Sequence, residues 1–324
     1  MKPDGYTYAF LIPDTEAFVS GGNLYNRHLI DALRERGHTI YEREDIEALP
    51  GGVPLLADTL LAPSLPSVEA ARAGLIVHHL ESLHPPAGWR GADWFQEKEW
   101  PWLKHYAWYL ATSPYTADYL RRMGVEGSVE VIEPALERLP ELHDKPSHPI
   151  QALIVANLVE RKGILPLLQA WAKAPPEGVV LRLAGGCGME SDYAAQCLSV
   201  LNQLEGVQYL GTLAQDALFA EYAQSNLLIS AAYMETYGMA LQEAAAAGLP
   251  ILAYAGGNVP NHVEVGRNGQ LCQSHTEIVS WLNRWAMQPE AFKPYLEHAR
   301  AFAPNRQRLW ADAAAQFEAI KTQR

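Results

Sequence analysis

The chain has 324 residues, a length that suggests two domains at roughly 100–200 residues per domain. Apolar residues make up 48% of it and charged residues 19%, a balance typical of a globular protein and not of a disordered or fibrous one. With 37 acidic against 25 basic residues the formal charge is −12, and neither half has the basic surplus that nucleic acid or an anionic membrane surface favours. We therefore expect no nucleic-acid partner, and peripheral membrane contact is not indicated.

The cysteines and the apolar runs bear on the compartment. Cys187, Cys197 and Cys272 are odd in number and lack Cys-x-x-Cys spacing, which fits a reducing compartment and argues against a disulfide scaffold or a cysteine-rich zinc site. No apolar run reaches the roughly 18 residues of a membrane-spanning helix. The first apolar stretch is interrupted by Pro13 and Asp14, unlike a secretion signal. We expect a cytoplasmic protein without a transmembrane segment.

The first half of the chain alternates apolar strand patterns with helical ones. Strands are expected at 6–12, 39–41, 75–78, 108–112 and 129–132, and helices at 23–36, 93–106 and 113–123, with a loop containing Gly21 and Gly22 before the first helix. Residues 139–149 hold three prolines and no apolar period, which predicts a domain linker.

The second half repeats the alternation more clearly. Strands are expected at 152–156, 179–184, 207–210, 227–230 and 251–254, and helices at 163–173, 190–204, 214–224 and 237–247, with one amphipathic helix over 304–323. Strands alternating with helices predict the α/β class, here two doubly wound parallel-sheet domains. Ligands of such sheets bind at the carboxyl ends of the strands, and two such domains facing each other leave a cleft for two substrates.

The most informative segment is residues 234–243 (METYGMALQE), which follows the strand at 227–230 as a helix begins. First-turn amides at Gly238, Met239 and Ala240 lack helical partners and, with the helix dipole, can bind a phosphate. Glu243 lies well inside the helix, where its carboxylate can accept hydrogen bonds from a ribose diol. The alternative is an acidic first turn followed by an ordinary helix glutamate.

Two weaker motifs also suggest anion binding. Lys162 begins a helix, a position that the helix dipole disfavours for a cation unless the cation faces a phosphate. The alternative is a solvated pair with Arg161. Gly21 and Gly22 permit close approach of the backbone to an anion, although they form no GxGxxG motif and could be a simple turn.

In this order and spacing, the three elements resemble those of retaining glycosyltransferases of family 4, which have the GT-B fold. Glu235 and Glu243 match the family's Glu-x7-Glu motif, and Lys162 with Gly163 matches its lysine–glycine helix start. The further matches are Gly21-Gly22 to the N-terminal glycine loop, residues 256–260 (GGNVP) to the late GG-x-P loop, and the tail helix with Trp310 to the one that crosses back to the N-terminal domain. The resemblance covers nearly the whole chain, most strongly 152–272.

The resemblance implies two facing Rossmann-like domains. Residues 1–145 would form an acceptor-side domain completed by the helix at 303–324, and residues 146–302 would bind a nucleotide-diphosphate sugar. The implied activity is transfer of a hexosyl group, with retention, to a hydroxyl of a carbohydrate or glycan-intermediate acceptor. UDP is favoured over GDP by family habit. The chain has no Asp-x-Asp triplet, so we expect a metal-independent reaction that requires no cofactor.

The resemblance also implies roles for single residues. Glu235 and His78 would lie near the donor sugar, and Lys162 would stabilise the leaving diphosphate, so these three are the predicted catalytic residues. The predicted donor-binding residues are Gly21, Gly22, Asn157, Arg161, Lys162, Tyr237, Gly238, Met239, Ala240 and Glu243. Three positions depart from the family: Asn157 replaces its usual arginine, Pro134-Ala135 its asparagine–glycine, and Asn261 a glutamate.

Histidines and tryptophans mark the acceptor side. His78, His79 and His84 cluster after the strand at 75–78, but adjacent residues of a strand point to opposite faces, so we expect no metal site. His79 and Trp89 are the predicted acceptor contacts, whereas Trp102 and Trp108 are expected to be core residues.

Three other functions remain open on the sequence. A nucleotide-sugar epimerase would bind the same donor without an acceptor, and a non-catalytic nucleotide-sugar-binding partner of another transferase would bind it without turnover. An NAD-dependent dehydrogenase would share the α/β pattern but is disfavoured by the missing GxGxxG motif.

Overall fold

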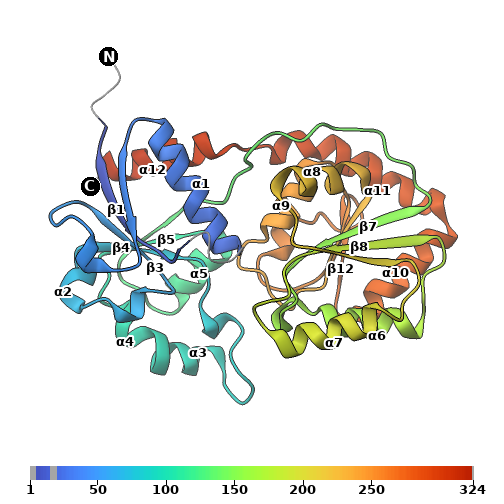
Figure 1. Ribbon diagram of the computed structural model, residues 1–324, viewed down its shortest axis with the longest axis horizontal. Helices are drawn as coiled ribbons and strands as arrows, with labels where there is room; N and C mark the ends of the chain where they lie inside the picture. Colours follow the sequence, from blue (N-terminus) through green and yellow to red (C-terminus); the bar gives the residue numbers. More distant parts are fainter. Residues whose placement is uncertain (1–4, 15–19, 323–324) are drawn as a thin grey trace. The chain divides into compact units, whose positions relative to one another are not determined.

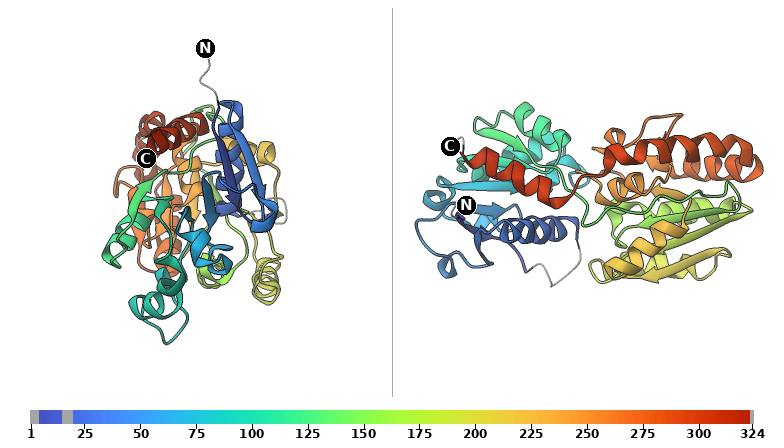
Figure 2. Two further views of the ribbon diagram at one scale, coloured as in Figure 1. Left: turned by 90° about the vertical axis from the view of Figure 1, so that its left-hand side faces the viewer. Right: turned by 90° about the horizontal axis from the view of Figure 1, so that it is seen from above.

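The computed structural model describes residues 5–14 and 20–322, and the chain divides into two compact units (Figure 1). Unit 1 is Met1–Glu137 with Arg308–Arg324, and unit 2 is Arg138–Gln307. Each unit contains one six-stranded sheet in which all paired strands are parallel, with helices on both faces (Figures 1 and 2). The prediction of two doubly wound α/β sheets is confirmed.

Unit 1 has the strand order β2-β1-β3-β4-β5-β6. Its strands are β1 (Thr7–Leu11), β2 (Thr39–Arg43), β3 (Leu55–Asp58), β4 (Ala73–Val77), β5 (Trp108–Ala111) and β6 (Ser128–Val131). Its helices are α1 (Gly21–Glu35), α2 (Ser67–Ala70), α3 (Gly91–Trp94), α4 (Trp100–Leu103), α5 (Pro114–Arg122) and α12 (Trp310–Thr322). The order reverses between β1 and β3, so the carboxyl ends of these two strands flank the expected ligand crevice of this sheet.

Alternating side chains of β1 build the two layers of unit 1. Tyr8 and Phe10 face helix α12, where their rings lie 5.3 and 6.4 Å from that of Phe317. Ala9 and Leu11 belong to the core on the opposite face of the sheet. The C-terminal helix is therefore an integral layer of unit 1.

Unit 2 has the strand order β12-β11-β10-β7-β8-β9. Its strands are β7 (Ile150–Val155), β8 (Val179–Ala184), β9 (Val207–Gly211), β10 (Leu227–Ser230), β11 (Ile251–Tyr254) and β12 (Gly269–Cys272). Its helices are α6 (Ile164–Lys173), α7 (Ser191–Leu201), α8 (Gln215–Gln224), α9 (Met239–Ala246), α10 (His275–Met287) and α11 (Pro289–Phe302). Helices α8 and α9 cover one face and α6, α7 and α10 the other (Figure 1). The order reverses between β7 and β10, which places the expected ligand crevice at their carboxyl ends.

The structure corrects several expected elements. Among the elements that were not predicted are strands β3 and β12, which are short, and helices α10 and α11. The helix expected at 93–106 is instead α3, a π-helical turn (Phe95–Glu99) and α4. The tail is not one helix over 304–323: a 3₁₀ turn (Ala303–Arg306) precedes α12, and Gln323 lies outside the described residues.

The boundary between the units falls at Glu137, earlier than the expected 145, because the predicted linker packs on unit 2. Lys145 Nζ donates hydrogen bonds to the carbonyls of Tyr222 and Ala223 at the end of α8, at 3.1 and 2.5 Å. Asp144 pairs with Arg300 of α11. Near the C-terminus the chain re-enters unit 1 at Arg308, five residues later than the expected position 303.

Candidate functional site

Lys162 lies at the carboxyl end of β7, at the strand-order reversal of unit 2. It is the last residue of a 3₁₀ turn (Glu160–Lys162) and not, as expected, the first residue of the helix. Gly163 separates the turn from α6 and has a φ of +63°. A Cβ at Gly163 would lie 2.2 Å from the carbonyl oxygen of Ala231, so only glycine allows this turn to approach the end of β10 so closely.

Glu235 meets Lys162 from the loop after β10. Its Oε1 accepts a hydrogen bond of 2.5 Å from Lys162 Nζ, and the two side chains are 14% and 16% exposed. Burial lowers the pKa of Lys162, and the Glu235 carboxylate offsets part of this effect. The pair thus places one cation and one anion, both largely withdrawn from water, at the crevice.

The loop after β11 holds the Glu235 loop in place. The Asn258 backbone amide donates to the Glu235 carbonyl at 2.7 Å, and the Asn258 Nδ2 donates to the Tyr237 carbonyl at 2.9 Å. His262 Nε2 donates to the same Tyr237 carbonyl at 2.7 Å. Burial lowers the pKa of His262 to about 4, so the ring is neutral at pH 7. The Tyr237 side chain is itself buried, so it packs inside the protein and supports the loop.

Helix α9 begins after Gly238, which has a φ of +94°. The amides of Met239 and Ala240 stand in its first turn, where helices leave N–H groups without an intrahelical acceptor. One turn further on, Glu243 Oε2 accepts a hydrogen bond of 2.7 Å from the hydroxyl of Tyr222. Tyr222 is 2% exposed, so Glu243 is held by a rigid partner from α8 that the sequence did not reveal.

The remaining predicted donor residues of unit 2 differ in setting. Asn157 Oδ1 accepts a hydrogen bond of 2.8 Å from the Gly186 amide, which ties the turn after β7 to the loop after β8. Arg161 is exposed, and its carbonyl accepts from the Tyr233 amide at 3.1 Å. Arg161 is therefore more exposed to solvent than Lys162, its neighbour in the sequence.

In unit 1, the predicted glycine loop is the first turn of a helix. Gly21 and Gly22 open α1, which Ser20 caps by accepting a hydrogen bond from the Asn23 amide. The expectation of a loop was wrong because this cap starts the helix two residues earlier than the apolar pattern does. A Cβ on Gly22 would lie 3.3 Å from the ring of His78, so the glycine brings α1 close to the end of β4.

His78 belongs to a polar cluster at the strand-order reversal of unit 1. Its Nε2 lies 2.8 Å from Asn26 Oδ1 and 3.3 Å from Asp58 Oδ2. Asp58, 1% exposed at the end of β3, also accepts hydrogen bonds from Asn26 Nδ2 at 2.7 Å and the Leu60 amide at 2.8 Å. Burial alone would raise the pKa of Asp58, but its interactions with His78 and the hydrogen bonds from Leu60 and Asn26 outweigh burial and lower the pKa. Asp58 and Asn26 were not predicted.

The predicted acceptor residues lie after β4 in the same unit. His79 is half-buried, and Trp89 packs edge-to-face on Trp94 at 5.2 Å with Lys98 Nζ 5.6 Å from its ring centroid. Trp108 is buried in the core as expected.

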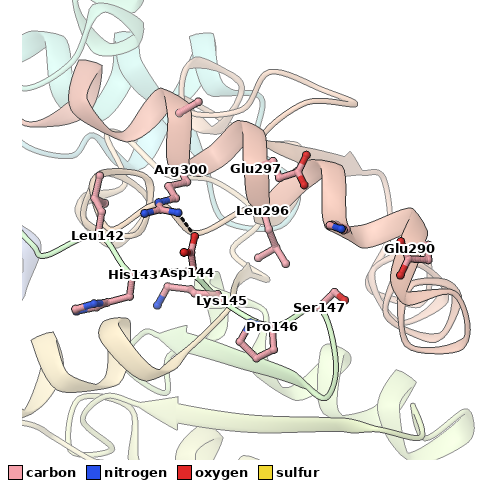
Figure 3. A pocket seen from close by; sticks show the side chains of 13 residues that line it. Leu142, His143, Asp144, Lys145, Pro146, Ser147, Glu290, Leu296, Glu297 and Arg300 are labelled. Carbon is pink, nitrogen blue, oxygen red and sulfur yellow. Dashed lines mark hydrogen bonds and ion pairs between the residues drawn. The ribbon is translucent and has the colours of Figure 1, made fainter.

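Two other kinds of site were sought in residues 5–14 and 20–322. This part of the chain contains no group of three or more His, Cys, Asp or Glu side chains placed to hold a metal ion, and no helix long and apolar enough to cross a membrane. A hollow of about 690 Å³ lies between residues 142–147 and helix α11 (Figure 3). Three cations line it: Lys145 donates to two α8 carbonyls, Arg300 pairs with Asp144, and Lys293 comes from α11.

The sheets define the class. Two α/β units, each with one parallel six-stranded sheet, are typical of transferases of the GT-B architecture. The model of the family "Glycosyl transferases group 1" matches residues 137–305, more than half of the chain and nearly all of unit 2. The chain belongs to this family.

Curated relatives match part of the chain. N-acetyl-alpha-D-glucosaminyl L-malate synthase of Bacillus anthracis is 29% identical over 119 residues, which are 37% of this chain and 31% of the relative. D-inositol 3-phosphate glycosyltransferase of Mycolicibacterium smegmatis is 30% identical over 146 residues, 42% of this chain and 33% of the relative. The matches thus span about a third of the length of these relatives.

Solved structures match the fold over nearly the whole chain. Sucrose-phosphate synthase of Thermosynechococcus elongatus has a TM-score of 0.81 at 19% identity, with 98% of both chains covered. HepE of Anabaena, solved with UDP and glucose, has a TM-score of 0.76 at 16% identity, with 99% of this chain and 100% of that chain covered. At these identities the likeness establishes the GT-B fold.

Proposed function

We propose that the protein is a retaining glycosyltransferase of family 4 that transfers a hexosyl group from a nucleotide-diphosphate sugar to a hydroxyl of a carbohydrate or glycan-intermediate acceptor. Unit 2 binds the donor, with UDP favoured over GDP, and unit 1 recognises the acceptor. The reaction needs no metal ion, and the protein works in the cytoplasm. HepE, a structural neighbour, was solved with UDP-glucose, which supports a UDP-sugar donor.

The observation that carries this proposal is the Lys162–Glu235 pair at the reversal point of unit 2, beside the start of α9. Cleavage of the glycosidic bond leaves negative charge on the departing diphosphate and positive charge on the sugar. The Lys162 ammonium and the amides of Met239 and Ala240 stabilise the first, and the Glu235 carboxylate the second. Glu243, already oriented by Tyr222, accepts hydrogen bonds from the ribose hydroxyls.

Calorimetric titration with UDP, GDP and NAD, first without divalent metal and then with Mg²⁺, tests the proposal. We expect one nucleoside diphosphate to bind with micromolar affinity in the absence of metal. NAD binding alone would refute the proposal. Nucleotide binding is then followed by incubation with the matching nucleotide sugars and a panel of hydroxyl acceptors. Interconversion of the donor without an acceptor would identify an epimerase, and binding without turnover a non-catalytic partner protein.

A further inference from the structure

Asn26, Asp58 and His78 form a hydrogen-bonded cluster in unit 1. Contact of His78 with a sugar would not by itself require the other two side chains. The three side chains come from α1, β3 and the end of β4, and they meet where the strand order of unit 1 reverses. In open α/β sheets this point is where ligands bind. The sheet topology therefore places the cluster where a ligand is expected to bind, independently of the family resemblance that pointed to His78.

The hydrogen bonds fix the orientation of the Asn26 amide. An ionised carboxylate only accepts hydrogen bonds, so the atom of Asn26 that lies 2.7 Å from Asp58 Oδ2 is the amide nitrogen. The other end of the amide, Oδ1, then faces His78 Nε2 at 2.8 Å. An amide oxygen only accepts, so Nε2 of His78 is the donor and carries a proton.

The rest of the imidazole is also defined by its neighbours. Gly22 packs along the Cδ2–Cγ edge of the ring, and Tyr25 meets the ring in an edge-to-face contact with centroids 5.1 Å apart. The edge that these contacts leave is Nδ1–Cε1, and Nδ1 has no hydrogen bond to any residue within 5–14 and 20–322. The His78 side chain is 12% exposed. In the neutral ring with a proton on Nε2, Nδ1 is an acceptor.

We infer that Asp58 and Asn26 are positioning residues that keep the single proton of the neutral His78 ring on Nε2, so that Nδ1 accepts a hydrogen bond from a sugar hydroxyl. The inference rests on the proposed function for the identity of the ligand, but the state of the ring does not depend on it. Without Asp58 and Asn26, the ring would sample the other tautomer, which presents a donor at Nδ1 in place of an acceptor.

The first test reads the tautomer directly in the ligand-free protein. Two-bond ¹H–¹⁵N correlation spectra of ¹⁵N-histidine-labelled protein distinguish a protonated from an unprotonated ring nitrogen, and His78→Gln assigns the His78 signals. We expect Nδ1 of neutral His78 to be unprotonated in the wild type. A protonated Nδ1 would overturn the inference without any variant having to fold.

The second test separates positioning from general structural support. We expect Asn26→Ala and Asp58→Asn to give mixed tautomers and to lower kcat by up to about 100-fold, the loss that misplacement of a reacting group can cause. The UDP dissociation constant, a property of unit 2, should stay unchanged. Asp118→Asn, which alters an exposed aspartate paired with Arg121 in the same unit, is the matched control and should leave tautomer and kcat unchanged.

The outcomes are distinguishable from failure of the proposed function. If the protein binds no nucleotide, the proposed function fails while the tautomer of His78 still decides the inference. If UDP binds and turnover occurs, but Asn26→Ala and Asp58→Asn both keep the wild-type tautomer and kcat, the positioning roles are refuted.

Discussion

The Lys162–Glu235 pair permits the sharpest test of the donor site, because without ligand the lysine is already paired. Binding of a nucleoside diphosphate must exchange the Glu235 carboxylate for the phosphate oxygens around the same ammonium. A charge-assisted hydrogen bond contributes about 1.5–3 kcal/mol, which corresponds to roughly 10- to 150-fold in affinity. In the wild type, UDP binding must break the 2.5 Å hydrogen bond between Lys162 and Glu235, which offsets part of the gain. We therefore expect Lys162→Met to weaken UDP binding by about tenfold, the lower end of this range.

Glu235→Gln should act on UDP in the opposite direction. Removal of the carboxylate frees the ammonium before the ligand arrives, so UDP should bind as tightly as to the wild type or more tightly. The pair also contributes to stability: loss of one partner of a buried pair costs about 3–5 kcal/mol and of an exposed pair about 0–1 kcal/mol. With side chains 16% and 14% exposed, we expect each single variant to lose about 2 kcal/mol and the double variant to lose less than the sum.

Calorimetry with UDP and urea denaturation measure the two effects. Lys173→Met, which removes an exposed lysine from the end of α6, is the control and should change neither quantity. A wild-type UDP affinity in Lys162→Met would refute the assignment of the donor site. Equal weakening by Lys162→Met and Glu235→Gln would show that the two groups bind UDP jointly and would refute the exchange.

Three further predictions concern other groups of the protein. Tyr222→Phe removes the donor to Glu243 Oε2 and should weaken UDP binding by about fivefold, the equivalent of a hydrogen bond of about 1 kcal/mol. Inhibition by pyrophosphate, which has no ribose, should stay unchanged. An equal loss of affinity for both ligands would refute the ribose role of Glu243. Gly163→Ala should lower Tm far more than Gly37→Ala. Both glycines have a positive φ, but only at Gly163 would the added Cβ meet a carbonyl oxygen, that of Ala231, at 2.2 Å. Similar losses of Tm in the two variants would contradict this prediction. Glu318→Gln should destabilise the protein at pH 7, because Arg36, above all, and His38 lower the pKa of Glu318 from 4.5 to about 2. The difference in unfolding free energy between variant and wild type should be fully present above pH 4.5 and vanish as the pH falls towards 2. A difference that persists near pH 2 in urea titrations would exclude this carboxylate as its source.

The sequence predicted the parts of the site that depend on local pattern. Lys162 and Glu235 each follow an apolar strand that is buried on both faces, and such strands are readily recognised. Once the sheet order is known, both fall at the ends of the neighbouring strands β7 and β10. The motif spacing could therefore indicate that Lys162 and Glu235 lie at one edge of the sheet, but their ion pair was not predicted.

The partners of these groups could not be predicted, because they depend on tertiary packing. Asp58 ends a four-residue strand, Leu55–Asp58, whose apolar run is too short to predict a strand by itself. Tyr222 appeared as one aromatic residue of an ordinary helix, and nothing in its spacing relates it to Glu243 on the next helix. Glu318 and Arg36 pair across nearly the whole chain. For His78 and Glu243, the sequence could indicate the residue proposed to meet a ligand but not the residue that orients it.

Asn157 illustrates how an orienting role can replace a charge. Its amide oxygen accepts from the Gly186 amide at 2.8 Å and its nitrogen donates to Met189 Sδ at 3.4 Å, so the side chain joins the turn after β7 to the loop after β8. A guanidinium has no acceptor atom, and an arginine at this position would leave the Gly186 amide without that bond. The asparagine therefore favours an ordered loop over a second cation beside Lys162. In the reaction we propose, stabilisation of the leaving diphosphate then depends more on Lys162 and on the start of α9, so Lys162→Met tests the whole proposed donor site.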